Sequence, residues 1–330
     1  TAPVLLDVTV DGERIPAVAQ ATKQTLLFAF NRETGEPLWP IEERPVPASL
    51  IPGEKLSPTQ PFPTKPAPYD LAGISEDDLI DFTPELRQQA IEALADWEIG
   101  PLYNPPLHRD NPLGKRGSFW CPGDGGGSNI TGPAAGDPET GIIYLTSQSA
   151  CAAHTLVPGD EADLRYMTDA GTTTTGVTPA QYANGAGGGA PRHPSGLPLM
   201  KPPYSRITAI DLNTGEHLWM IPIGETPDRI KNNPALAGVD VGNTGSGAQA
   251  PMLVTPSMLV YAGDVSDGTP HLFAIDKATG RELARIPVSA ASRYGMMSYV
   301  HKGEQYIVLQ TGPKLTAMSL HGPRATAAAH

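Results

Sequence analysis

The sequence predicts a large, turn-rich, all-β protein, and three observations support this prediction. Glycine and proline together account for 71 of the 330 residues (35 Gly and 36 Pro). Both residue types break helices, so a helical bundle or a coiled coil is excluded. Valine, isoleucine, leucine and tyrosine recur in short, separated runs of strand length, a pattern that disordered chains lack. A strand–turn–strand unit also recurs along the chain, which predicts an array of similar sheets.

The repeated unit is a strand, a tight turn and a second strand. Its three copies span residues 27–39, 207–219 and 272–284. In each copy an Asn or Asp caps the turn through its side chain, and a glycine takes the positive φ that other residues avoid. Two copies end in Trp39 and Trp219, which we expect to pack between sheets, whereas the third has Ala284. A similar turn at 137–141 is expected in a different hairpin. Units that cannot bury their own faces predict a radial or linear array of such sheets, which we call blades.

Long insertions are expected between the blades, at about residues 45–115 and 155–203. The first insertion opens with a proline-rich stretch, which should be extended and lie outside any regular ladder. Further along, Thr83 precedes Pro84 and an apolar face at helical spacing, which predicts a short helix that braces the propeller. The second insertion contains the glycine run 185–189, which lacks the strand-then-helix context of a phosphate loop.

Charge and cysteine content exclude several classes of partner and metal site. The chain has 23 basic and 35 acidic residues, a formal net charge of −12, which argues against a nucleic-acid backbone as partner. Its apolar runs are much shorter than the ~20 residues needed to span a bilayer. Two cysteines without a CxxC pair exclude a thiolate zinc module. The eight histidines show no HxxxH or HExxH spacing, so no dedicated metal site is predicted in this chain.

Several segments match one known family in that family's order. They are residues 17–35, 45–47, 57–62, 100–106, 137–141, 223–227, 261–263 and 303–308. Together they resemble the PQQ-dependent dehydrogenases, in particular the branch that contains membrane-bound glucose dehydrogenase. The resemblance implies that residues 1–330 are the C-terminal part of a single propeller domain with eight blades in the complete enzyme. Such enzymes oxidise an alcohol or sugar, and hydride passes to pyrroloquinoline quinone (PQQ), which carries a Ca²⁺ ion.

The resemblance assigns three candidate cofactor residues. Lys23 matches the family's basic residue beside the quinone, where an ammonium would stabilise the negative charge that develops during hydride transfer. Asn129 could donate its amide to the cofactor, although glycine-rich turns also use Asn for positive φ. The family often has a tryptophan next in this region, where this chain has Ile130 and Thr131. Gln249 lies in a loop that matches one near the quinone in the family.

The resemblance also implies which parts are elsewhere. The family's catalytic Asp and its Ca²⁺ ligands fall upstream of residue 1, so this chain alone is predicted to be inactive. Its expected partners are the N-terminal half of the propeller, an alcohol or sugar substrate, and a quinone or cytochrome as electron acceptor. The family's compartment is the periplasm, whose oxidising conditions favour a disulfide between Cys121 and Cys151. The alternative for these cysteines, two separate buried thiols, stays open.

A competing function is a non-catalytic propeller that serves as a protein-docking scaffold. Such scaffolds share the repeated turn but lack the cofactor lysine and the long proline-rich insertions. Both features are present in this chain, so the sequence favours the dehydrogenase over the scaffold.

Overall fold

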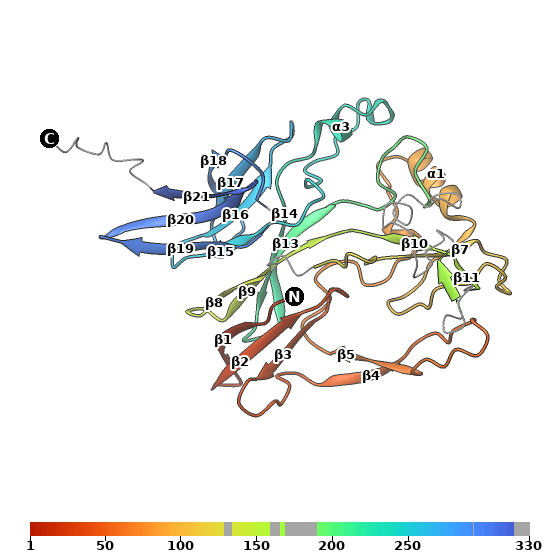
Figure 1. Ribbon diagram of the computed structural model, residues 1–330, viewed down its shortest axis with the longest axis horizontal. Helices are drawn as coiled ribbons and strands as arrows, with labels where there is room; N and C mark the ends of the chain where they lie inside the picture. The colour runs from red at the N-terminus through yellow and green to blue at the C-terminus, as the bar shows by residue number, and fades with distance from the viewer. Residues whose placement is uncertain (129–133, 159–165, 169–189, 293, 320–330) are drawn as a thin grey trace.

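The computed structural model describes residues 1–128, 134–158, 166–168, 190–292 and 294–319. Within these residues, four antiparallel sheets of three or four strands each follow one another along the chain, and we call them the first to fourth blades (Figure 1). The first blade consists of β1 (Val4–Val10), β2 (Glu13–Ala21) and β3 (Leu27–Asn31). The second consists of β8 (Ala134–Asp137), β9 (Ile142–Gln148), β13 (Ser205–Asp211) and β14 (Glu216–Pro222).

The remaining two blades lie toward the C-terminus. The third consists of β15 (Met252–Val254), β16 (Leu259–Asp264), β17 (Pro270–Ile275) and β18 (Glu282–Pro287). The fourth consists of β19 (Met296–His301), β20 (Glu304–Thr311) and β21 (Lys314–Ser319). The first strands of successive blades contact each other: β1 with β8, β8 with β15, and β15 with β19. The predicted all-β, propeller-like fold is therefore confirmed.

Each copy of the repeat forms the third strand of a blade, a tight turn, and the residues after the turn that pair with this strand at the outer edge of the blade. In the second blade, the Gly215 amide donates to the Asp211 carbonyl at 2.7 Å, and the Asn213 amide donates to the Asp211 carboxylate at 2.8 Å. Gly215 has φ +76°, as the sequence predicts for this turn. The turn at 137–141 has the same geometry and joins β8 to β9.

Tryptophans connect neighbouring blades through these turns. Trp39, after the first blade, packs so closely on Gly215 that a Cβ there would lie 3.1 Å from the indole. Trp219 of the second blade packs on Gly280 of the third in the same way, and its indole N–H donates to the Lys277 carbonyl at 3.2 Å. The glycines are therefore needed for close approach as well as for positive φ. Ala284 takes the tryptophan position of the third copy and has no indole to reach the fourth blade.

The segment between the first and second blades forms a separate layer. It contains β4 (Ile41–Pro45), β5 (Thr59–Pro63), η1 (Glu76–Asp78), α1 (Pro84–Leu94), β6 (Trp97–Glu98) and β7 (Gly117–Trp120). Thr83 caps α1 by accepting from the Leu86 amide at 3.2 Å, so the predicted helix is confirmed. The expectation that the proline-rich stretch avoids regular ladders is wrong, because β4 and β5 pair from Ile41 to Pro63. A two-stranded ribbon has only edge strands, and edges tolerate proline.

Shorter elements complete the described chain. They are β10 (Ala152–His154), β11 (Leu156–Pro158), β12 (Tyr166–Thr168), α3 (Asp228–Lys231) and η2 (Pro234–Leu236). β10 pairs with β7, and β7 pairs with β6. No helix among the described residues is long and apolar enough to cross a membrane. The glycine run 185–189 lies outside the described residues.

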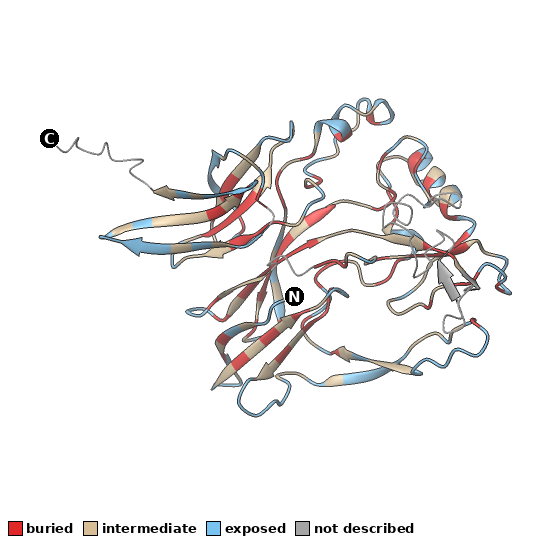
Figure 2. Cartoon of the chain, viewed as in Figure 1, coloured by how far each residue is buried: buried red, intermediate tan, exposed pale blue. Residues whose placement is uncertain are grey.

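The core is divided among the blade interfaces. Figure 2 shows buried residues along β13 and β16 and on the inner side of α1. The outward faces of the first and fourth blades carry exposed or half-buried apolar side chains. On the first blade this face carries Leu5, Val18 and Phe30, which are neighbours across the ladder. On the fourth it carries Tyr299, which stacks on Tyr306, and the exposed Leu315.

Candidate functional site

Lys23 lies in the turn that connects β2 to β3. This turn, residues 22–26, is closed by the Thr22 amide donating to the Leu26 carbonyl at 3.0 Å. The Lys23 side chain is exposed, and its Nζ donates to the backbone carbonyl of Asp124 at 3.1 Å. Asp124 is 101 residues away in sequence, so the contact joins the first blade to the layer before the second.

The segment that Lys23 contacts is a glycine-rich loop, residues 123–128, which we call the glycine loop. The Gly127 amide donates to the Lys23 carbonyl at 2.9 Å, and the Gly126 amide donates to the Gly123 carbonyl at 2.8 Å. A Cβ at Gly126, which has φ +72°, would lie 2.6 Å from Lys23 Cβ. A Cβ at Gly127 would clash with the methyl group of Thr25. Only glycine allows this loop to lie directly against the lysine turn.

Gln249 reaches the same loop from the segment before β15. Its Nε2 donates to the Gly127 carbonyl at 2.7 Å, and the Gln148 amide donates to that carbonyl at 2.8 Å. The structure therefore brings Lys23 and Gln249 to one loop from two different blades. Asn129 follows this loop in sequence but lies outside the described residues. The cofactor roles of all three residues stay predictions.

Two further side chains adjoin the lysine. His154 Nε2 lies 3.0 and 2.9 Å from the two carboxylate oxygens of Asp124, and its ring stacks on Trp120 at 4.8 Å. Neither Asp124 nor His154 was predicted from the sequence as a site residue. Asp124 could have been found, because it stands within the glycine loop that precedes Asn129. His154 could not, because its position depends on the pairing of β10 with β7.

A disulfide supports the base of the glycine loop. Cys121 and Cys151 are bonded, with their Cα atoms 4.4 Å apart. Of the two alternatives left open by the sequence, the structure shows the pair. Two residues beyond Cys121, the Gly123 amide donates to the Ala150 carbonyl at 2.6 Å. The disulfide therefore joins the start of the glycine loop covalently to the segment between β9 and β10, next to this hydrogen bond.

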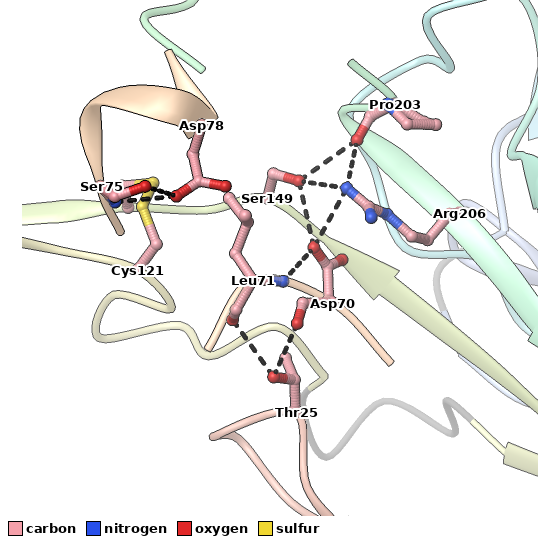
Figure 3. The surroundings of a disulfide bond; sticks show 10 residues. Thr25, Asp70, Leu71, Ser75, Asp78, Cys121, Ser149, Pro203 and Arg206 are labelled. Carbon is pink, nitrogen blue, oxygen red and sulfur yellow. Dashed lines mark hydrogen bonds and ion pairs between the residues drawn. A yellow bond between two sulfur atoms is a disulfide. The ribbon is translucent and has the colours of Figure 1, made fainter. Parts of the chain in front are cut away.

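A buried polar cluster lies next to the lysine turn (Figure 3). Asp70 Oδ1 accepts from Arg206 Nη2 at 3.1 Å and from the Leu71 amide at 2.7 Å. Arg206 Nη2 also donates to Ser149 Oγ at 3.0 Å and to the Pro203 carbonyl at 2.8 Å. The side chains of Asp70 and Arg206 are only 1% and 12% exposed, so this is a buried ion pair between the insertion and β13. It borders a cleft of about 630 Å³.

The described residues contain no group of three or more His, Cys, Asp or Glu side chains that could hold a metal ion. The chemistry that they offer is hydrogen-bond donation and positive charge at Lys23. These groups suit a ligand that carries carbonyl or carboxylate oxygens.

Comparisons with known proteins place this chain in a family. Residues 1–307 match the PQQ family described as "Glucose/ethanol/alcohol dehydrogenase, beta-propeller domain". A glycerol dehydrogenase large subunit of Gluconobacter thailandicus is 28% identical over 321 residues, which cover 92% of this chain and 41% of the relative. A probable quinate dehydrogenase (quinone) of Xanthomonas campestris pv. juglandis is 30% identical over 317 residues, 92% of this chain and 37% of the relative. Quinoprotein glucose dehydrogenase of Escherichia coli (strain K12) is 27% identical over 324 residues, 94% and 38% respectively.

Solved structures of similar proteins include a quinohemoprotein alcohol dehydrogenase, ADHIIG, from Pseudomonas putida HK5. It has a TM-score of 0.46 and 16% identity and covers 96% of this chain and 35% of its own. A europium-containing methanol dehydrogenase has a TM-score of 0.46 and 15% identity, with 94% and 39% covered. The chain spans about two-fifths of the length of the curated relatives named above. Because the family match extends over residues 1–307, the chain belongs to the PQQ-dependent glucose, ethanol and alcohol dehydrogenases with a β-propeller domain.

Proposed function

We propose that this chain is the C-terminal part of a periplasmic PQQ-dependent dehydrogenase that oxidises an alcohol or sugar. The observation that carries the proposal is the convergence of Lys23 and Gln249 on the glycine loop. The contact places an exposed ammonium next to a loop whose position is fixed from two blades.

The residues present fit one side of PQQ. The cofactor carries quinone and carboxylate oxygens, which accept hydrogen bonds. The Lys23 ammonium has three N–H donors, and one is used on the Asp124 carbonyl. Among the described residues this leaves two donors for a bound group. Gly126 and Gly127 are buried against the side chains of Lys23 and Thr25, so the loop fixes the lysine turn and leaves the exposed ammonium as the group that a ligand can reach.

When bound, PQQ supplies the two-electron acceptor for the substrate's hydride. Lys23 would hold its positive charge where negative charge develops on the acceptor oxygen, which lowers the barrier electrostatically. The Asp124 carbonyl would keep that ammonium in place, so little reorganisation is needed during the reaction. In this proposal, the described residues would orient and stabilise the reacting group.

The catalytic Asp and the Ca²⁺ ligands are proposed to come from the N-terminal half of the propeller. The apolar side chains left exposed on the outward faces of the first and fourth blades support this proposal, because blade faces are normally buried against neighbours. The two-fifths coverage of the relatives also supports it. The electron acceptor is proposed to be a quinone or a cytochrome.

The test is reconstitution with PQQ and Ca²⁺ of both the isolated chain and the protein that carries the N-terminal half. Dye-linked oxidation of glucose, glycerol, quinate and ethanol is measured in each. We expect turnover only in the complete protein, and tight PQQ binding only there. PQQ binding is followed by quenching of tryptophan fluorescence. A complete, folded protein that fails to bind PQQ would refute the proposal and favour a protein-docking scaffold.

A further inference from the structure

Thr25, two residues after Lys23, has an unusual backbone. Its φ is +64°, in the left-handed region, although it is a β-branched residue with no exposed surface. This conformation is a genuine outlier for a β-branched side chain and costs free energy that glycine would avoid. Such strain persists only where the surroundings require the side chain.

Of the three other non-glycine residues with positive φ among the described residues, Tyr103 lies in the insertion and the other two stand in hairpin turns. Asp11 and Lys302, both with φ +51°, are exposed and stand directly before a glycine in two-residue hairpin turns. Paired positive φ values are what such turns require. Thr25 also stands in a hairpin turn, as the last residue of the loop 23–25, and its amide donates to the Thr22 carbonyl at 3.2 Å. Such three-residue loops place their last residue in the left-handed region, so the hairpin accounts for the positive φ. It does not account for a buried threonine at a position where glycine is usual.

The surroundings of Thr25 show what its side chain does. Its methyl group lies against Gly127, so closely that a Cβ at that glycine would clash with it. Its hydroxyl lies 2.6 Å from the Gln24 carbonyl, 3.1 Å from the Leu71 carbonyl and 3.3 Å from the Asp70 carbonyl. One hydroxyl proton is shared among these three acceptors. The side chain therefore fills the space between the glycine loop and the insertion (Figure 3).

The insertion also holds the lysine turn through its backbone. The Tyr69 amide donates to the Thr25 carbonyl at 3.1 Å, and the Tyr69 hydroxyl donates to the Thr22 carbonyl at 2.7 Å. The next residue, Asp70, is anchored to Arg206 on β13. The turn that carries Lys23 is therefore fixed from the second blade, through residues 69–71.

We propose that Thr25 is a positioning residue for Lys23: it holds the lysine turn against the glycine loop so that the ammonium is placed for the cofactor. The inference rests on the proposed function, since it assigns Thr25 to the same site. Thr25 itself touches neither substrate nor cofactor.

The experiment replaces Thr25 by Gly in the complete protein, with Asp11→Gly as the matched control. Both substitutions relieve a positive φ, but only Thr25→Gly removes a methyl and a hydroxyl from the site. We expect the Kd for PQQ to rise at least tenfold in Thr25→Gly, with a melting temperature close to that of the unchanged protein. Asp11→Gly should leave the Kd unchanged.

A second measurement does not depend on PQQ. The Gly127 amide is bonded to the Lys23 carbonyl, so its hydrogen exchange reports whether the turn and the loop stay together. Exchange at Gly127 should be at least tenfold faster in Thr25→Gly and unchanged in Asp11→Gly. If the unchanged protein does not bind PQQ, the proposed function fails, and this exchange rate alone still decides the role of Thr25.

Wild-type exchange at Gly127 together with a wild-type Kd in Thr25→Gly would overturn the inference. If Thr25→Gly does not fold, Thr25→Ser makes the same comparison, because it keeps the hydroxyl and loses only the methyl. In that variant we expect about threefold weaker PQQ binding and faster Gly127 exchange. Wild-type values for both in Thr25→Ser would refute the positioning role.

Discussion

Replacing Arg206 by Met tests whether the buried ion pair holds the insertion onto the second blade. The substitution keeps an unbranched side chain that can pack along β13 but removes the guanidinium. The contacts that Arg206 Nη2 makes with Asp70, Ser149 and the Pro203 carbonyl are absent from the variant. The Asp70 carboxylate, with its side chain 1% exposed, keeps only the Leu71 amide and the Ser149 hydroxyl.

The expected loss in the free energy of unfolding depends on the Asp70 charge, which stays buried without its partner. Removing one partner of a buried pair typically destabilises a protein by about 3–5 kcal/mol, because the other charge stays buried and uncompensated. Asp70→Asn removes that charge, so the double variant Arg206→Met/Asp70→Asn should recover about 2 kcal/mol of the loss. The apparent free energy of unfolding is measured by urea titration of the complete protein, followed by tryptophan fluorescence.

Arg14→Met is the matched control. Arg14 also pairs with a carboxylate, Asp7, at 2.8 Å, but its side chain is 77% exposed. Exposed pairs contribute about 0–1 kcal/mol, so this variant should unfold within 1 kcal/mol of the unchanged protein. The reasoning is refuted if Arg206→Met and Arg14→Met cost the same, or if the double variant is no more stable than Arg206→Met alone.

Three further predictions concern the cofactor lysine, the blade contacts and pH. Lys23→Ala should lower kcat of the complete enzyme by about 10²–10³-fold, as for loss of an oxyanion donor, without lowering Tm. An unchanged kcat in steady-state kinetics would contradict the role of Lys23 in stabilising the developing charge. Trp219→Ala should cost about 3 kcal/mol in urea unfolding, because the indole packs on Gly280; a loss below 1 kcal/mol would count against that packing. Burial alone would raise the pKa of Asp137, but hydrogen bonds, chiefly from Lys277 at 2.7 Å, lower it below the ordinary 3.8. The stabilisation that ionised Asp137 gives the folded protein is fully present above pH 3.8 and is lost as the pH falls through the lowered pKa. Acid unfolding should therefore begin at higher pH in Lys277→Met. Identical acid-unfolding curves for the variant and the unchanged protein would contradict this.

Local chemistry explains which features could be predicted from the sequence. The repeated turns follow from an Asx residue and a glycine a few positions apart, so Asp211 and Gly215 specify their hairpin without distant contacts. Helix α1 likewise follows from the Thr83 cap and its apolar face.

Contacts between distant segments could not be predicted in the same way. Asp70 and Arg206 are 136 residues apart, and no local pattern marks either as part of a pair. The pairing of β4 with β5 was missed because proline normally signals the end of a ladder, although a two-stranded ribbon accepts it. Thr25 carried no sequence signal, because threonine is not a residue that marks the left-handed position of a turn, where glycine is usual.

The alanine at position 284 has a mechanical consequence for the fourth blade. The first three blades are linked in series by Trp39 and Trp219, each packed on the next turn. At Ala284 this series stops, and a groove of about 450 Å³, lined in part by Met258 and Ile286, lies between the third and fourth blades. Under a pulling force or a slow opening fluctuation, this junction should therefore separate before the other two. The same groove leaves room for the fourth blade to change its tilt relative to the third, so small changes in the angle between these two blades need not disturb the first three.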